Sequence, residues 1–197
     1  MIRSEELAKE TTIAYTDGKE FFYDHVSRFM LHAIDKTRQL INIKVNSQRR
    51  SMKGILFLFV EPYNAGTRDS EKFIFPDLNK VSVTINRSPK LLYNNGIESR
   101  DAWRQVSRFF MKEKHKPQHM TLQKFYTKDK VGLLINLRSM ASQEMHGSGT
   151  HLINTADGVQ LEIKRDTKGS GTVNCHVFII SDAQFNIQNK QLESVQY

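Results

Sequence analysis

The sequence predicts a mainly β protein, an antiparallel β-sandwich with one inserted α-helix. The first observation is the unbroken apolar run Ile55–Val60, which is too short for a helix of ordinary length and indicates a strand buried on both faces. The second is a series of segments that alternate apolar and polar residues between turn signals. The third is a single segment with helical apolar spacing. Burial on both faces predicts a second sheet against one side of the central strand, and a helix or a neighbouring subunit against the other.

The bulk composition is that of one large folded domain. The chain has 197 residues, of which 39% are hydrophobic, and its twelve phenylalanines argue against disorder. No apolar run follows the charged start and none reaches membrane-spanning length, so we expect neither a secretory signal nor a membrane span. The single Cys175 fits the reducing cytoplasm or nucleus, because one cysteine forms neither an internal disulfide nor a thiolate zinc site.

The first forty residues differ in pattern from the remainder. We therefore expect two parts, an N-terminal arm or lead-in segment at 1–40 and a sandwich domain at 41–197. Within the first part, Phe21–Leu40 carries apolar residues at spacings of three and four, which favours a helix or an irregular packed segment. Ile41–Val45 then alternates apolar and polar residues and is predicted to be a half-buried strand.

The middle of the chain contains a strand and the predicted helix. Pro76 cannot donate a ladder hydrogen bond, so the strand that follows the central run is predicted to start near Leu78 and to reach Asn86. Ser99–Lys112 is predicted to be the helix, because Ser99 is a good N-cap and one apolar stripe follows it. That stripe consists of Ala102, Trp103, Val106, Phe109 and Phe110.

The C-terminal third is again rich in β signals. Asp157-Gly158 predicts a turn into a one-sided strand. The expected strands are Met120–Tyr126, Val131–Leu137, Val159–Lys164, Val173–Ser181, and a last one from Ala183–Ile187 and Leu192–Tyr197. The predicted core comprises Ile55, Phe57, Phe59, Val81, Val83, Trp103, Phe109, Leu161, Val177 and Ile179.

Positive charge is concentrated in one segment of a chain whose net charge is +8. Between Arg104 and Lys130, eight basic residues stand against Glu113 and Asp129. Such a segment attracts nucleic acid phosphates, an acidic membrane face or an acidic protein surface, although a solvated helix face followed by a charged loop is the simpler explanation. The candidate contact residues are Arg104, Arg108, Lys112, Lys114, Lys116, Lys124, Lys128 and Lys130.

No set of residues predicts catalysis, a metal site or a cofactor. His115 and His119 have a zinc-like spacing, but Pro117 lies between them and no further ligands are near. The GSGT sequences at 147–150 and 169–172 lack the lysine of a phosphate-binding loop and are predicted to be turns. Cys175, His176, Ser181 and Asp182 include nucleophilic residue types, yet Cys175 and His176 point to opposite faces of a strand. His146 and His151 are interpreted as turn residues.

Four segments, taken together and in order, resemble the C-terminal part of double-jelly-roll major capsid proteins of Polinton (Maverick) elements and adintoviruses. They are Ile43–Pro62, Glu71–Phe110, Leu133–Arg165 and Asn174–Ile187. The resemblance implies a jelly-roll sandwich and a non-enzymatic capsid protein that acts by self-association, as a trimer and with other capsid proteins, in the virion. That family builds shells from chains with two barrels, whereas 197 residues accommodate one. The chain is therefore a separated C-terminal barrel or a single-barrel relative.

Three other functions stay open at this point. A basic nucleic-acid-binding β-sandwich module is the second hypothesis, because of the charged segment. A carbohydrate-binding sandwich is the third, and the only tryptophan, Trp103, lies on the predicted helix stripe rather than on an exposed platform. An enzyme with a small-molecule substrate is the class that the sequence favours least.

Overall fold

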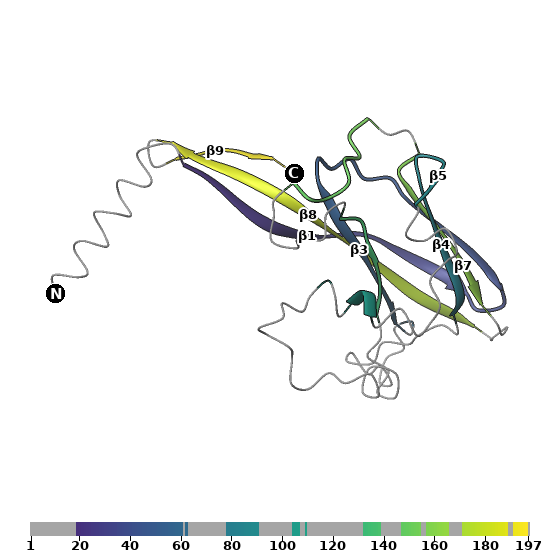
Figure 1. Cartoon of the computed structure of the whole chain (residues 1–197). Coiled ribbons are helices and arrows are strands. Elements are labelled where there is room, and N and C mark those ends of the chain that lie inside the picture. The colour runs from purple at the N-terminus through teal and green to yellow at the C-terminus, as the bar shows by residue number, and fades with distance from the viewer. Residues whose placement is uncertain are drawn as a thin grey trace.

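The fold is a sandwich of two antiparallel sheets (Figure 1). The structure, a computed structural model, describes residues 19–60, 62, 78–90, 104–106, 109, 132–138, 147–154, 157–165, 171–188 and 191–196. One sheet has the order β1 (Lys19–Asp35), β8 (Thr172–Gln188), β3 (Met52–Val60) and β6 (Gly132–Asn136), with β9 (Gln191–Gln196) paired to β8. The other has the order β2 (Leu40–Val45), β7 (Val159–Arg165), β4 (Leu78–Ile85) and β5 (Ser88–Pro89).

The first eight strands pair in a nested order. β1 pairs with β8, β2 with β7, β3 with β6 and β4 with β5, so the chain resembles one long hairpin of four strand pairs that has been rolled up. The further pairs β3 with β8 and β4 with β7 join these hairpin layers into the two sheets. This is the jelly-roll topology, and the predicted fold class is confirmed.

The core lies between the two sheets and follows the alternation of the sequence. β2 has the burial pattern exposed–buried over all six residues, which is the half-buried strand predicted from Ile41, Ile43 and Val45. Nine of the ten predicted core residues are buried, from Phe57 at 0% exposed to Phe109 at 6%. The tenth, Trp103, lies outside the described residues.

One face of β3 is fully buried and the other is partly covered, with Leu56 and Leu58 half-buried, so the cover predicted from the unbroken run is found in part. Ile55, Phe57 and Phe59 face the second sheet and belong to the main core. On the opposite face Phe109 packs with Leu134 and Ile180 in a second buried cluster. Arg104–Val106 and Phe109 are helical, in agreement with the predicted helix as far as it is described. Other predicted features lie outside the described residues, namely most of Ser99–Lys112, the strand Met120–Tyr126, and His115, His119 and His146.

Close approach of the helical segment to the sheet depends on a glycine in β3. A Cβ added at Gly54 would lie 2.9 Å from Cε2 of Phe109 and 3.2 Å from the carbonyl oxygen of Ile135. Only glycine therefore lets the Phe109 ring reach the sheet at this position. The helical segment thus contacts the sheet where the Phe109 ring packs over Gly54.

The prediction of a helix or an irregular segment at Phe21–Leu40 is wrong. This part of the chain is β1, which pairs with β8 over almost its full length. A bulge between Arg28 and Met30 lets the neighbouring residues Phe29 and Met30 both pack against the core, which breaks the two-residue alternation and produces spacings of three and four. The described part of the sandwich consequently begins at Lys19, whereas the sequence placed its start at residue 41.

Two turns owe their shape to backbone conformation. Asn86 and Arg87 both have positive φ angles, 48° and 66°, and join β4 to β5 as a tight two-residue hairpin. Gly158, at φ 58°, forms the predicted Asp157-Gly158 turn, and a Cβ there would lie 2.5 Å from the carbonyl oxygen of Val45.

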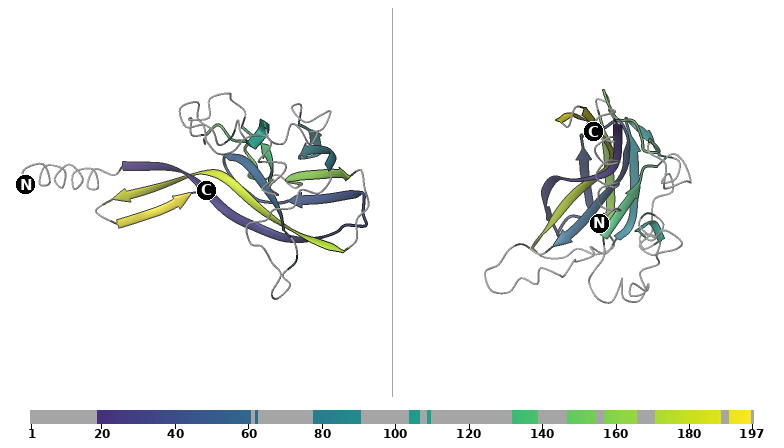
Figure 2. Two further views of the ribbon diagram at one scale, coloured as in Figure 1. Left: turned by 90° about the horizontal axis from the view of Figure 1, so that it is seen from below. Right: turned by 90° about the vertical axis from the view of Figure 1, so that its left-hand side faces the viewer.

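The last strands extend beyond the sandwich. β8 runs without a break from Thr172 to Gln188, so the two strands expected on either side of Asp182 are one, and β9 forms the expected final strand. Figure 2 shows that the start of β1, the end of β8 and β9 form a ribbon that projects from the body of the molecule. In this ribbon the rings of Phe21 and Phe185 stack with centroids 5.0 Å apart.

Candidate assembly surface

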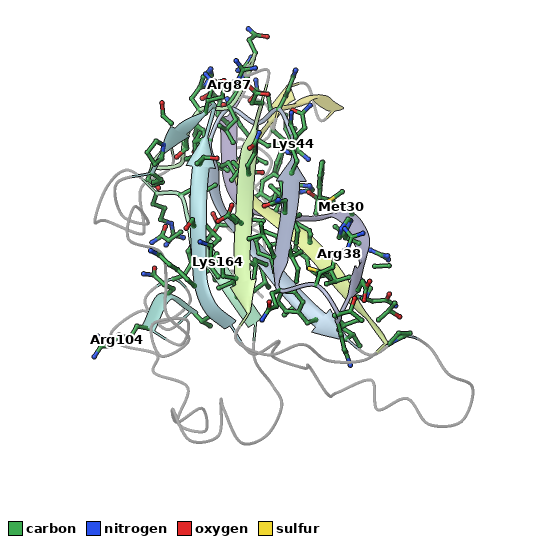
Figure 3. The ribbon with its side chains drawn as sticks, turned by 90° about the vertical axis from the view of Figure 1, so that its right-hand side faces the viewer. Met30, Arg38, Lys44, Arg87, Arg104 and Lys164 are labelled. Atoms are coloured by element: carbon green, nitrogen blue, oxygen red, sulfur yellow. The ribbon has the colours of Figure 1, made fainter. Side chains whose placement is uncertain are left out.

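The outer face of the second sheet is mainly polar, although Leu40 at the start of β2 is 46% exposed there. The outward side chains of this sheet line a shallow hollow of about 400 Å³, bounded by Asn42, Lys44, Ser82, Thr84, Gln160 and Glu162 together with the backbone of Ile43 and Leu161. Figure 3 shows Lys44 and Lys164 on this side of the molecule. Asp157 accepts a hydrogen bond of 3.3 Å from Lys44 Nζ and pairs with Arg87 Nε at 2.5 Å, and these contacts lower the pKa of its carboxyl group. This face has the character of a solvated surface.

The outer face of the first sheet carries exposed apolar side chains beside charged ones. Ile180 is buried there beneath Phe109, and its cross-strand partner on β1 is Val26, whose side chain therefore points to the same face. Val26 is 58% exposed and Phe22, four residues before it on β1, is 47% exposed. Val26 thus extends the apolar cluster beneath the helical residues towards β1, and Phe22 lies beyond Asp24 on the same face.

β1 also lies at the edge of its sheet. In the described part of the chain it is the outermost strand next to β8, and it is 17 residues long. A long edge strand offers backbone groups for pairing with another strand, and an exposed apolar face beside it favours burial against a partner. We define the outer face of β1 around Phe22 and Val26, with this edge, as the β1 surface.

A buried charge cluster lies on the same face of the sheet. Asp24 on β1 and Asp182 on β8 are direct cross-strand partners, an arrangement in which two carboxylates repel each other. Lys53 lies between them and offsets part of this repulsion, because its Nζ is 2.6 Å from Asp24 Oδ1 and 2.5 Å from Asp182 Oδ1. The Lys53 side chain is 2% exposed, Asp182 9% and Asp24 56%.

The second oxygen of Asp182 binds a loop to the sheet. Asp182 Oδ2 accepts hydrogen bonds from Ser51 Oγ at 2.6 Å and from the backbone N–H of Gly147 at 2.9 Å. Ser51 Oγ in turn accepts a hydrogen bond from the N–H of Gly149 at 3.0 Å. Met52 and Thr150 then form a two-hydrogen-bond bridge, so residues 147–150 lie against the start of β3. The first GSGT sequence is therefore a docked turn.

Arg138 links the charge cluster to the helical segment. Its guanidinium carbon lies 3.9 Å from the centroid of the Phe109 ring. Burial lowers the pKa of Arg138, and the nearby carboxylates of Asp24 and Asp182 oppose that shift. Arg138 thus covers Phe109 while its charge is balanced by the same two aspartates that hold Lys53.

The structure tests only one of the eight basic residues that the sequence proposed as contacts. Arg104 is exposed, and Figure 3 shows it well away from Lys44 and Lys164. The remaining seven lie outside the described residues. Cys175 belongs to the main core, and burial raises the pKa of its thiol to about 12, so it is not an activated nucleophile. Across the described ranges, no three His, Cys, Asp or Glu side chains gather as a metal site would require.

Sequence reasoning missed the charge cluster around Lys53. The one local signal was a lysine next to the central apolar run, and Asp182 was considered only in connection with Cys175 and His176. Asp24 lay in a segment that was not expected to be a strand. Only the register of β1, β8 and β3 brings the three side chains together.

The fold is shared with solved capsid proteins. No protein-family model and no curated protein sequence matches this chain. Among solved structures, VP54 of PBCV-1, fitted into a reconstruction of the virophage Sputnik, is similar over 96% of this chain and 54% of its own, with a TM-score of 0.59 and 8% identity. The Faustovirus major capsid protein is similar over 91% of this chain and 36% of its own, with a TM-score of 0.55 and 10% identity.

The chain has the jelly-roll fold of viral major capsid proteins. A quasi-atomic model of the PBCV-1 capsid gives the same result, with a TM-score of 0.57 and 8% identity over 96% of this chain. The resemblance found in the sequence is confirmed at this level, and a Polinton or adintovirus origin stays a prediction. The chain spans about half or less of the length of these capsid proteins.

The described helical residues contain no segment long and apolar enough to cross a membrane.

Proposed function

We propose that this chain is a capsid building unit of viral or transposon origin that acts by self-association into a shell. The observation that carries the proposal is the combination of a capsid jelly-roll fold with an uncovered β1 surface, where Val26 is 58% exposed beside a 17-residue edge strand. A homotrimer that also contacts other capsid proteins is the assembly we favour. The protein acts in the virion and lies in the host cytoplasm or nucleus before assembly.

The contrast between the two outer faces supports the choice of surface. The outer face of the second sheet exposes one large apolar side chain, Leu40, and the β1 surface exposes two, each of which gains about 25 cal/mol per Å² that it buries. Interfaces of stable oligomers are apolar at their centre. Contacts between copies are therefore expected at the β1 surface and not over Gln160 and its neighbours.

Sedimentation velocity over a range of protein concentrations tests this proposal. We expect a discrete oligomer, or a particle of shell size, that dissociates on dilution. Val26→Asp places a carboxylate on the β1 surface and should shift the distribution towards the monomer, whereas Gln160→Asp places the same group on the exposed polar face and should not. Far-ultraviolet circular dichroism establishes that both variants are folded. A strict monomer at every concentration would refute self-association by this chain alone.

The second candidate function is nucleic-acid binding by the segment Arg104–Lys130. Its support is a local charge of +6, from eight basic and two acidic residues. Changing Lys112, Lys114 and Lys116 together to glutamate should abolish binding to a labelled duplex measured by fluorescence anisotropy, and wild-type binding should fall steeply with salt. Changing Lys44, Lys80 and Lys164 to glutamate alters the net charge equally and serves as the control. Equal losses in the two variants would argue against a specific basic segment.

A further inference from the structure

The cluster around Lys53 has the composition of a reactive site as well as that of a salt bridge. Lys53 Nζ lies 2.5 Å from Asp182 Oδ1 and 2.6 Å from Asp24 Oδ1, and the Lys53 side chain is 2% exposed. Condensation of an amine with a carboxyl group requires the neutral form of each. Transfer of one proton from the Lys53 ammonium to Asp182 Oδ1, along the 2.5 Å contact between them, would supply both.

We propose that Lys53 and Asp182 condense spontaneously into an isopeptide bond. The Lys53 nitrogen, the nucleophile, already contacts an oxygen of the Asp182 carboxyl group, whose carbon is the electrophile. The pairing of β3 with β8 holds the two groups next to each other in the folded protein. A side-chain amide between these strands is a covalent cross-link within one sheet. This inference is independent of the capsid role.

The surroundings of Asp182 supply the stabilisation that amide formation needs. When the nitrogen lone pair of Lys53 attacks the carboxyl carbon, the electron pair of the C=O bond moves to Oδ2. Two donors already point at that oxygen, the hydroxyl of Ser51 at 2.6 Å and the N–H of Gly147 at 2.9 Å. They form an oxyanion hole, and the N–H of Gly149 strengthens it by donating to Ser51 Oγ.

Asp24 carries the proton. After the attack, the positively charged nitrogen gives one proton to Asp24 Oδ1, which lies 2.6 Å from Nζ. Asp24 returns this proton to the Oδ1 hydroxyl of Asp182, the C–O bond breaks, water leaves, and the C=O bond forms again at Oδ2. Of the three ammonium protons, one stays on the amide nitrogen and two leave in the water, so the balance is one ammonium and one carboxylate giving one amide and one water. The partly exposed side of Asp24 gives the water an exit.

Lys44 provides a natural comparison within the same molecule. It also pairs with an aspartate, Asp157, but at 3.3 Å and with 48% of its side chain exposed. An exposed ammonium stays charged and hydrated, and Asp157 has its other oxygen occupied by the Arg87 cation instead of neutral donors. No cross-link is expected there.

Intact-mass spectrometry of the purified full-length chain tests the proposal. We expect a mass lower than that of the sequence by one water molecule, and a branched peptide that joins the segments around Lys53 and Asp182 after digestion. Lys53→Met and Asp24→Asn should restore the full mass, whereas Lys44→Met should keep the deficit. Dehydration of Asp157-Gly158 to a succinimide also removes water, but hydroxylamine cleaves that product and leaves a side-chain amide intact.

The full sequence mass in folded wild-type protein would overturn the inference. A deficit that hydroxylamine removes, or one that persists in Lys53→Met, would overturn it too. Retention of the deficit in Asp24→Asn would overturn the role assigned to Asp24. Because the decisive reading is made on the wild-type chain, failure of a variant to fold does not affect it.

Discussion

Replacing Phe57 with alanine tests whether β3 is the centre of the fold. Phe57 is 0% exposed and lies between Leu133 on β6 and Val177 on β8, both of which are also fully buried. Truncation of a fully buried phenylalanine costs about 3–5 kcal/mol, because the lost transfer free energy adds to that of the cavity left behind. Domains of this kind have an unfolding free energy of about 5–15 kcal/mol. The variant should therefore retain the fold with much of its stability lost.

Urea denaturation followed by far-ultraviolet circular dichroism measures this loss. The midpoint should fall at an unchanged slope, and the thermal midpoint should fall by about 6–20 °C, from roughly 2–4 °C per kcal/mol in a chain of this size. Val26→Ala on the exposed face of β1 is the control and should cost less than about 0.5 kcal/mol in the monomer. Equal effects of the two substitutions would refute the assignment of the core, and a soluble folded Phe57→Asp protein would refute it as well.

Three further predictions concern the core cysteine, the docked turn and the arginine over Phe109. Burial raises the pKa of the Cys175 thiol from 9.0 to about 12, so between pH 9 and pH 12 the thiol ionises in the unfolded chain but not in the folded one. Its contribution to the unfolding free energy is therefore complete below pH 9 and is lost as the pH rises to 12. The urea midpoint should fall less over that pH range in Cys175→Ala than in the wild type. Gly149→Ala places a Cβ 2.6 Å from backbone carbons of Ser51 and Met52, which should loosen the bridge between Met52 and Thr150 and accelerate hydrogen exchange of the Thr150 amide. Gly171→Ala, whose Cβ meets no atom within 4 Å, should leave the exchange rate of Thr150 unchanged. Arg138→Gln removes the cation above Phe109 and should lower the unfolding free energy by about 1 kcal/mol, and no change in the urea midpoint would contradict that contact.

The parts of the fold that local patterns determine were predictable. Ile41–Val45 and Val159–Lys164 alternate in the sequence because one face of each strand meets the core and the other meets water. The run Ile55–Val60 predicts cover on its second face too, and Phe109 supplies part of it by packing in the same cluster as Leu56. These inferences require only the local sequence of one strand and the knowledge of which of its faces are buried.

The misread segments depend on partners far away in the sequence. β1 is held as a strand by β8, and its bulge at Phe29 imitates the spacing of a helix, so no local signal identifies it. The cluster of Lys53, Asp24 and Asp182 exists only because three strands adopt one register. Likewise, the positive φ angles of Asn86 and Arg87 follow from the hairpin that they close, and neither residue is the glycine that would have indicated it.

The nested strand order has a consequence for the time at which the protein folds during its synthesis. β1 leaves the ribosome early, but its pairing partner β8 begins only at Thr172, and the central strand β3 also needs β8. Contacts between such distant parts of a chain form slowly, because the closure of a long loop must precede them. The sandwich therefore closes only after β8 has been translated, and nascent chains crowded on one messenger have their strand edges exposed until then. Chaperones that shield extended apolar segments would act on this protein throughout elongation, before any of its surfaces is complete.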